Sequence, residues 1–353
     1  MSAHPSSADL VGVVVPTFNR RELLREALES VRGQTHERLE VLVMDNGSSD
    51  GTDDLMRGIR DARIRYVVNP RNLGLSGSID AGVGLFSSAV EWCCVVCDDD
   101  LLDPSFVQEA LTRASESRAS AVVSGQRVFV DAAGKMIRDA LPAIGEESAV
   151  TYLGARLRVQ RETYLTGLLF NRRAFQAIGG YPKFTTGLAS DDALIFALAM
   201  SDRLVHAPLA IARIRLHAGA ESRSAKDALA KLDTVDEFCG SCLRAADAGK
   251  LSDAERTELK RTLALYRRGL RSYWWQIAMR AAAESRDPSA SPIVTHLRAL
   301  VATEPSSFWP LIRLSAWIQR NTRIDLERSP RYHAAVRRLQ EVVNALRGLP
   351  KER

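Results

Sequence analysis

Long hydrophobic runs are missing from this sequence of 353 residues. No window approaches the ~18 consecutive apolar residues that a membrane-crossing helix needs. Residues 1–9 are polar and contain neither a basic patch nor an apolar core, so the sequence predicts no secretory signal peptide. We therefore expect a protein that is neither secreted nor membrane-spanning.

Cysteines are few, and their spacing matches no complete metal site. Three of the five, Cys93, Cys94 and Cys97, lie in one apolar run, while Cys239 and Cys242 form a lone C-x-x-C. A zinc ribbon needs a second such pair. The lone pair could be a redox or metal fragment, but packing on a helix is the favoured interpretation. A reducing cytoplasm is the expected setting.

Aromatic residues are also scarce, at 6%, although 46% hydrophobic and 26% charged residues are typical of a soluble globular protein. The net charge of +5 is unevenly distributed, because residues 251–353 hold 19 Lys and Arg against 10 Asp and Glu. This asymmetry indicates either a basic appendage that meets an anionic partner or ordinary solvated helix faces. No nucleic-acid recognition motif accompanies the charge, so we expect no nucleic-acid partner.

Short apolar runs alternate with helical patterns in the first half of the chain. Repetition of strand, helix and strand predicts an α/β fold with a mostly parallel sheet flanked by helices. After about residue 222 the pattern is helical only, which predicts a domain over residues 1–222 and a helical region over residues 223–353. The expected strands are 11–15, 39–44, 64–68, 91–97, 121–123, 127–130 and 209–216, and the expected helices are 20–32, 73–90, 191–200, 225–285, 292–302, 307–320 and 330–347.

Polar loops follow four of the expected strands, at 16–20, 45–49, 69–74 and 98–100. In open α/β sheets, ligands bind beyond the carboxyl ends of the strands. We therefore expect these four loops to converge and to form one carboxylate-rich site.

The sharpest feature of that site is the triplet Asp98-Asp99-Asp100. Three adjacent carboxylates repel one another unless a cation lies among them. Hard oxygen ligands favour Mg²⁺ or Mn²⁺, which commonly bridge protein carboxylates to substrate phosphates. On an extended backbone Asp98 and Asp100 would project to one side and Asp99 to the other. Capping of a helix explains one or two of the three aspartates, so the triplet favours a metal site.

Several motifs occur in a fixed order over about residues 10–220. They are Pro-Thr-Phe-Asn-Arg at 16–20, Asp-Asn-Gly-Ser-Ser at 45–49, Asn-x-x-Asn-x-Gly at 69–74, the Asp triplet, Gly-Gly-Tyr at 179–181 ahead of Asp191-Asp192, and Arg215-x-His217. This ordered set resembles the family 2 inverting glycosyltransferases. Those enzymes have a GT-A fold and use nucleotide-diphospho-sugars.

The resemblance implies where the donor nucleotide and the metal would bind. Asp45 matches the carboxylate that reads the base, usually uracil. Asp100, or Asp99 if the register shifts by one residue, would bind Mn²⁺ or Mg²⁺. His217 could add a metal or pyrophosphate contact, although a lone His beside a strand is commonly structural. The implied nucleotide-binding residues are Pro16, Thr17, Phe18, Asn19, Asp45, Asn46, Arg71, Asp98 and Asp99.

The resemblance also implies the catalytic residues. Asp192 matches the general base of the family, and Asp191 stands where many members carry Glu. Inverting transfer needs one carboxylate to take the proton of the attacking acceptor hydroxyl, whereas a glycosidase needs two carboxylates that flank the bond. A helix cap is the alternative interpretation of this pair.

We therefore expect a metal-dependent inverting glycosyltransferase, of hexosyltransferase type, that acts in polysaccharide or glycoconjugate biosynthesis. The expected donor is a UDP-sugar, or else a dTDP-sugar, and the acceptor is a carbohydrate, a lipid-linked molecule or a natural product. The helical region 223–353 would serve acceptor recognition, homo-oligomerisation or contact with a membrane surface. The expected location is the cytoplasm, with peripheral contact at the inner membrane face as a further option.

Two other functions compete with this expectation. A sugar-phosphate nucleotidyltransferase should carry a glycine-rich phosphate loop after its first strand, and residues 16–20 contain no glycine. A non-catalytic binding or scaffold protein could keep the same fold. Such a protein would have no need of both the Asp triplet and the Asp191-Asp192 pair.

Overall fold

The computed structural model describes residues 9–119, 121–216 and 228–283. Residues Met1–Ala278 form one compact unit and residues Met279–Arg353 a second. The described strands are β1 Val11–Thr17, β2 Leu39–Asp45, β3 Ile64–Val68, β4 Trp92–Val95, β5 Leu101–Leu102, β6 Val122–Val130, β7 Met136–Asp139, β8 Glu146–Glu147, β9 Leu168–Asn171 and β10 Leu204–Arg215. The helices are α1 Arg21–Arg32, α2 Thr52–Gly58, α3 Gly74–Leu85, α4 Phe106–Ser117, α5 Ala149–Leu157, α6 Arg172–Ala177, α7 Ser190–Ala199, α8 Ala228–Ala248 and α9 Asp253–Ala283.

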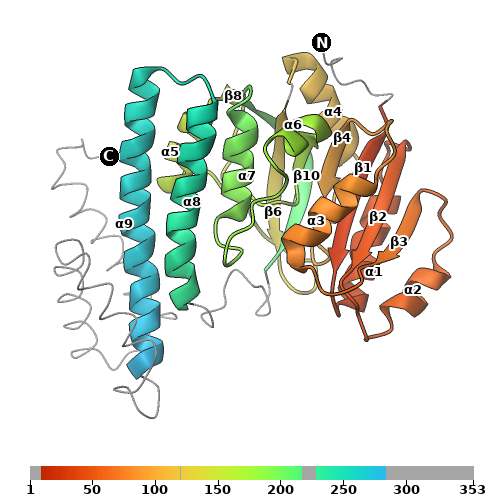
Figure 1. The fold of residues 1–353 in the computed structure, drawn as a ribbon. Helices are drawn as coiled ribbons and strands as arrows, with labels where there is room; N and C mark the ends of the chain where they lie inside the picture. Colours follow the sequence, from red (N-terminus) through yellow and green to blue (C-terminus); the bar gives the residue numbers. More distant parts are fainter. Residues whose placement is uncertain (1–8, 120, 217–227, 284–353) are drawn as a thin grey trace. The chain divides into compact units, whose positions relative to one another are not determined.

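The described strands form one mixed sheet in the order β3-β2-β1-β4-β9-β6-β10-β5 (Figure 1). The neighbours β3, β2, β1 and β4 are parallel, whereas β9 is antiparallel to both β4 and β6. β10 then runs parallel to β6. The α/β fold is confirmed, and the carboxyl ends of β1, β2, β4, β6 and β10 share one edge of the sheet.

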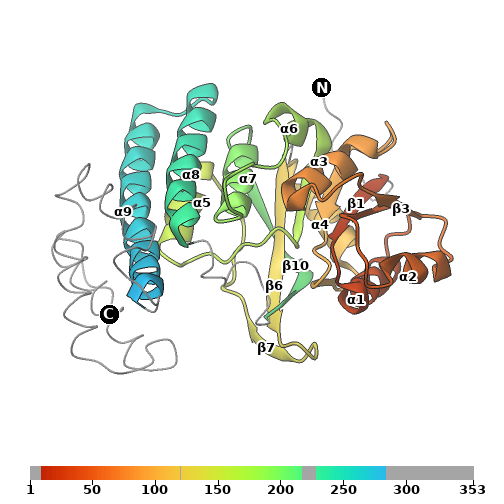
Figure 2. The ribbon, with the colours of Figure 1, turned by 60° about the horizontal axis from the view of Figure 1, so that its bottom comes forward.

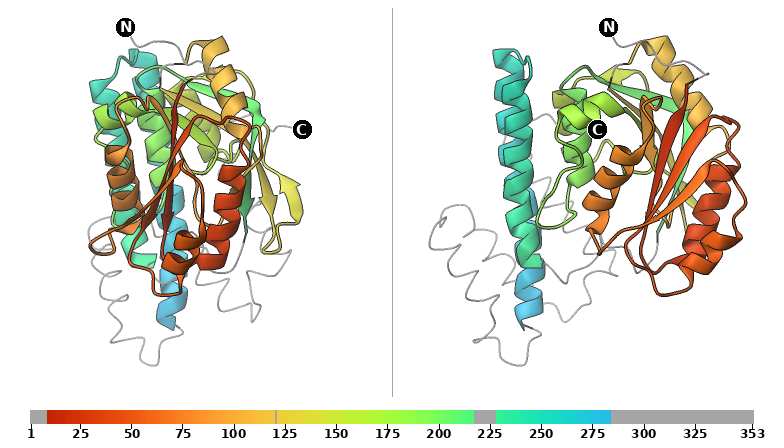
Figure 3. Two further views of the ribbon diagram at one scale, coloured as in Figure 1. Left: turned by 90° about the vertical axis from the view of Figure 1, so that its right-hand side faces the viewer. Right: turned by 45° about the vertical axis from the view of Figure 1, so that its right-hand side comes forward.

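Two hydrophobic layers cover the two faces of the sheet. Because side chains alternate along a strand, Val14 of β1 packs in the layer under α3 and α7, and Val13 packs in the layer under α1 and α4. Every residue of β1 is buried, which explains its uninterrupted apolar run. Figure 3 shows the strands between α3 on one side and α1 on the other.

Most expected strands are confirmed, with two differences. The strands expected at 121–123 and 127–130 are one continuous strand, β6. The strand expected at 209–216 begins earlier, at Leu204, and its pairing with β6 is irregular between Ala207 and Ile211. Pro208 lies in this interruption, and proline cannot donate a hydrogen bond to a neighbouring strand. β6 continues into the β7 hairpin, which projects at the bottom of Figure 2.

The helical segment expected at 225–285 is divided into α8 and α9, and α8 lies beside α7 in Figure 1. Cys239 and Cys242 are buried in the hydrophobic layer on α8, as the packing interpretation predicts. The helices expected at 292–302, 307–320 and 330–347 lie outside the described residues, and the boundary near residue 222 stays a prediction. Within the described part of the chain, no helix has the length and apolarity to cross a membrane.

Candidate active site

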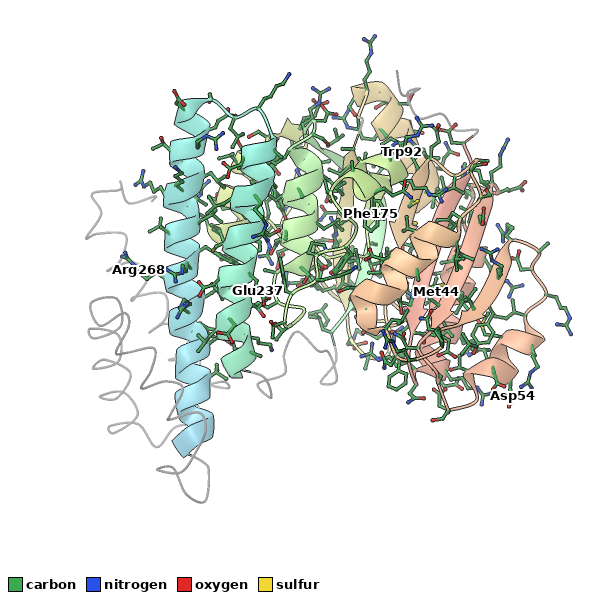
Figure 4. The ribbon with its side chains drawn as sticks, in the orientation of Figure 1. Met44, Asp54, Trp92, Phe175, Glu237 and Arg268 are labelled. Carbon is green, nitrogen blue, oxygen red and sulfur yellow. The ribbon has the colours of Figure 1, made fainter. Side chains whose placement is uncertain are left out.

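The carboxyl edge of the sheet carries the candidate site. Met44, near the end of β2, marks this edge in Figure 4, and Trp92, the first residue of β4, marks the opposite edge. Thr17 and Asp45 lie in register where β1 and β2 end. The loops that follow β1 and β2 therefore begin side by side, and their polar side chains lie near one another.

Hydrogen bonds connect the loops at this edge. The Asn19 side-chain oxygen accepts from the Ser49 N–H at 2.7 Å, and the Asn19 N–H donates to Ser48 Oγ at 2.8 Å. The Thr17 hydroxyl donates to Asp98 Oδ2 at 2.8 Å. The loop after β1 is thus tied both to the loop after β2 and to the Asp triplet.

Asp45 and Asn46 both point into the structure. Asp45 Oδ1 accepts from the Ser48 N–H at 2.8 Å, and its Oδ2 accepts from the Tyr66 hydroxyl at 2.5 Å. Burial, followed by this bond to Asp45, raises the pKa of Tyr66. Asn46 Oδ1 accepts from the Asn69 side chain at 3.0 Å. Both residues shape the loops, and their predicted contact with a nucleotide stays a prediction.

The Asp triplet does not continue the extended backbone of β4. That strand ends at Val95, and the chain turns at Asp98 and Asp99. Arg20 Nη1 lies 3.0 Å from Asp98 Oδ1 and 2.9 Å from Asp99 Oδ2. The expectation that Asp98 and Asp99 point to opposite sides is therefore wrong, because the turn brings both carboxylates to one guanidinium.

Asp100 forms the core of the candidate metal site. It is 6% exposed, and its Oδ1 accepts from the Arg215 N–H at 3.0 Å. Burial, assisted by the charge of Asp99, raises the pKa of Asp100 to about 7. The ligand atoms of Cys97, Asp99 and Asp100 all lie within 4.8 Å of one another. The carboxylates of Asp99 and Asp100 are oxygen ligands of the kind that Mg²⁺ and Mn²⁺ prefer. The third expected contact, His217, lies outside the described residues.

Asp191 lies in the first turn of α7 and belongs to the same edge. Its Oδ1 accepts from the Tyr181 hydroxyl at 2.5 Å, and its Oδ2 accepts from the Leu165 N–H at 3.0 Å. Its charge acts on both Cys97 and Arg127. Burial raises the pKa of the Asp191 carboxyl, although the Tyr181 hydrogen bond opposes this shift.

Comparison with known proteins identifies the domain that holds this edge. The family model described as "Glycosyl transferase family 2" matches residues 12–178. Residues 12–178 form a family 2 glycosyltransferase domain. Asp191 and the helices α7 to α9 follow this matched segment.

Curated relatives resemble the glycosyltransferase domain over part of their length. A GalNAc(5)-diNAcBac-PP-undecaprenol beta-1,3-glucosyltransferase of Campylobacter jejuni is 32% identical over 111 residues, which cover 31% of this chain and 36% of that protein. The succinoglycan biosynthesis protein ExoO of Rhizobium meliloti is 31% identical over 128 residues, or 36% of each chain. The matches therefore span about a third of the length of these relatives.

Solved structures share the fold over most of the chain. TarS 1-349 of S. aureus, in complex with UDP-GlcNAc, has a TM-score of 0.62 at 14% identity and covers 88% of this chain and 91% of that one. The mannosyltransferase PcManGT of Pyrobaculum calidifontis, in complex with GDP-Man and Mn²⁺, has a TM-score of 0.51 at 18% identity, with coverage of 91% and 90%. The expected GT-A fold is thus confirmed.

The Asp192 side chain is held by residues of α5 and of the segment that follows it. Asp192 Oδ1 accepts from the Tyr152 hydroxyl at 2.7 Å, from Arg156 Nε at 2.9 Å and from the Thr163 hydroxyl at 3.2 Å. Successive residues of a helix are rotated by about 100°. Asp191 and Asp192 therefore face different surroundings, and the expected assignment of Asp192 as the base stays a prediction.

The remaining predicted residues of the glycosyltransferase domain are divided between core and surface. Pro16 is buried inside β1. Phe18 is 44% exposed beside the loop after β2, and Arg71 is exposed in the loop after β3. Phe18 and Arg71 are accessible to a ligand, whereas Pro16 acts through the backbone that it fixes.

Sequence reasoning missed three contributors to this edge. Arg20 binds the carboxylates of Asp98 and Asp99, and Cys97 joins the candidate metal ligands. Arg215 Nε donates to the Asp99 carbonyl at 3.0 Å and so holds the turn. Arg20 is the last residue of the motif at 16–20 and Cys97 directly precedes the triplet at 98–100, and these positions were the available signal.

Replacement of Arg156 by Met should lower the free energy of unfolding by about 1–3 kcal/mol, because the buried Asp192 carboxylate loses its charged donor. Urea denaturation measures this change. Arg158→Met is the matched control, since Arg158 is exposed on the same segment and should change stability by less than about 0.5 kcal/mol. Equal unfolding midpoints for the two variants would show that Asp192 does not depend on Arg156.

Proposed function

We propose that this protein is an inverting glycosyltransferase that moves a sugar from a UDP-sugar to an acceptor hydroxyl. One observation carries the proposal. Two consecutive residues contact the two halves of the site, since the Leu165 N–H donates to Asp191 and the Thr166 hydroxyl accepts from the Cys97 N–H at 3.0 Å. A carboxylate base and a cation-binding turn are therefore held on one short segment.

Asp191 serves as the general base in this proposal. The acceptor oxygen attacks the anomeric carbon while Asp191 takes the hydroxyl proton. The bond from the anomeric carbon to the diphosphate oxygen breaks, and its electrons leave with the nucleoside diphosphate. Attack opposite the leaving group inverts the anomeric centre. The raised pKa of Asp191 suits this role, because a base is most effective when its pKa approaches the working pH.

Asp100 and Asp99 would hold Mn²⁺ or Mg²⁺ at the turn after β4, with the Cys97 sulfur within 4.8 Å of their oxygens. When bound, such a cation neutralises the charge that develops on the leaving diphosphate. The protein's own contribution is to bury Asp100 and to fix the turn through Arg215. The Mn²⁺ complex of the fold relative PcManGT supports a divalent cation in this kind of site.

The proposed identities of the donor and the acceptor rest on the ligands and substrates named for similar proteins. The UDP-GlcNAc complex of the fold relative TarS favours a UDP-sugar over a dTDP-sugar. The undecaprenol-linked substrate in the name of the Campylobacter jejuni relative favours a lipid-linked or carbohydrate acceptor in polysaccharide or glycoconjugate biosynthesis. Cytoplasmic location, peripheral membrane contact and homo-oligomerisation stay predictions.

The C-terminal helical region is proposed to take part in acceptor recognition. Glu237 of α8, labelled in Figure 4, accepts from the Thr185 N–H at 2.6 Å. Thr234 of α8 accepts from the Thr186 N–H at 3.1 Å. Since residues 185 and 186 precede α7, the first described helix of this region fixes the approach to Asp191.

Asp191→Asn should lower kcat by about 10²–10⁴-fold, because the attacking hydroxyl loses its proton acceptor. The measurement is UDP release from a panel of UDP-sugars, with water or added sugars as the acceptor. The affinity for UDP and the melting temperature should stay close to those of the wild type.

Asp192→Asn is the matched control for this substitution. It should reduce stability but leave kcat per folded molecule within a few-fold of the wild type. A loss of turnover in Asp192→Asn with normal turnover in Asp191→Asn would reverse the assignment of the base. UDP binding without turnover in the wild type would favour a non-catalytic binding protein.

Asp100→Asn should remove the gain in UDP affinity that Mn²⁺ provides, because the buried oxygen ligand is lost. Thermal unfolding with UDP, dTDP, GDP or CDP, each with and without Mn²⁺, measures this effect. A ligand at ~100 times its Kd adds about 2.7 kcal/mol to the folded state. Asp54→Asn, on the exposed surface of α2 (Figure 4), is the control. An unchanged Mn²⁺ dependence in Asp100→Asn would contradict the metal assignment.

A further inference from the structure

Arg127 of β6 is a fully buried arginine whose hydrogen bonds go to uncharged groups. It is 2% exposed. Nη1 donates to the Gly125 carbonyl at 2.6 Å and to the Ser124 hydroxyl at 2.5 Å. Nη2 donates to the Tyr164 carbonyl at 2.8 Å, and Nε donates to the Thr166 carbonyl at 3.4 Å. One guanidinium thus joins β6 to the segment Tyr164–Gly167.

This segment is the one that contacts both halves of the candidate active site. Its Leu165 N–H donates to Asp191, and its Thr166 hydroxyl accepts from the Cys97 N–H. Thr166 also makes a side-chain hydrogen bond that stabilises the charged form of Asp100. Arg127 binds the carbonyls of Tyr164 and Thr166, so it fixes the two peptide units that flank the pair Leu165-Thr166.

Gly167 allows the close approach between the segment and Arg127. Gly167 has φ of +97°, and a Cβ on it would lie 2.9 Å from Arg127 Nε. The Gly125 N–H donates to the Gly167 carbonyl at 2.8 Å, which closes the other side of the contact. A side chain at residue 167 would push the segment off the guanidinium.

Charge explains why an arginine is tolerated at this depth. A buried cation is costly unless negative groups lie near it. Burial lowers the pKa of Arg127 to about 10, and the negative charges of Asp191 and Asp100 oppose this shift, although neither carboxylate accepts one of its four hydrogen bonds given above. The two carboxylates that the proposed reaction uses therefore help to retain the charge of the buried guanidinium.

We infer that Arg127 is a positioning residue for glycosyl transfer. Through the segment Tyr164–Gly167 it fixes the Asp191 carboxylate relative to the turn that holds Asp100. It does so without contacting substrate, and the inference rests on the function proposed above. Displacement of a base by about 1 Å costs on the order of 10² in rate, so this role is measurable in kcat.

The test compares Arg127→Lys and Arg127→Met with Arg172→Met in UDP release, normalised to the folded fraction. Lys keeps the charge but cannot span the carbonyls of Tyr164 and Thr166. Both Arg127 variants should therefore lose about 10²-fold in kcat, with KM for the UDP-sugar within a few-fold of the wild type. Arg172 also donates to two backbone carbonyls, those of Phe86 and Ser87, away from this edge. Arg172→Met should lose stability but keep kcat.

Thr166→Val is a second variant that leaves the buried cation in place, should the Arg127 variants fail to fold. Loss of the hydroxyl should lower kcat by about tenfold, as supporting contacts around a site commonly do. Unchanged kcat in folded Arg127→Lys or in Thr166→Val would overturn the inference while the proposed function stands. A parallel loss of UDP affinity and kcat in Arg127→Lys would also overturn it. Absence of turnover in the wild type would overturn both.

Discussion

Burial of negative charge at the carboxyl edge of the sheet is the constraint on which the rest of the structure depends. Asp98 and Asp100 are 5% and 6% exposed, and burial raises the pKa of each. Carboxylates at such depth need donors or cations to remain charged. Arg20 supplies a cation to Asp98, and the Arg215 N–H supplies a donor to Asp100. The neighbouring loops and arginines supply the donors and cations that these buried carboxylates need.

The same constraint separates two neighbouring aspartates of α7. Asp192 is paired with Arg156 and hydrogen-bonded by Tyr152 and Thr163, which is the environment of a structural carboxylate. Asp191 receives a hydroxyl and a backbone N–H and lies within the electrostatic influence of Arg127. The first arrangement anchors α7 against α5. The second leaves a carboxylate beside the candidate metal site, as the proposed reaction requires of its base.

Sequence patterns predicted the sheet and its functional edge because buried strands and polar loops leave clear periodic signals. They could not predict that the chain turns at Asp98, since the turn depends on Arg20 and Arg215 from distant segments. The motif also could not distinguish the surroundings of Asp191 from those of Asp192, because these depend on the packing of α7 against α5. The role of Arg127 could not be predicted either, because it depends on residues far away in the sequence. An arginine within an apolar strand signals a buried polar contact, but its partners lie 37 and 39 residues away.

The most direct test of the central claim is a crystal structure with UDP and Mn²⁺, with the metal located by its anomalous scattering. The account predicts a manganese peak between the diphosphate and Asp100, with Asp191 on the side where the sugar would lie and Asp192 still paired with Arg156. A metal bound elsewhere, or a nucleotide seated away from the turn at Asp98–Asp100, would contradict it.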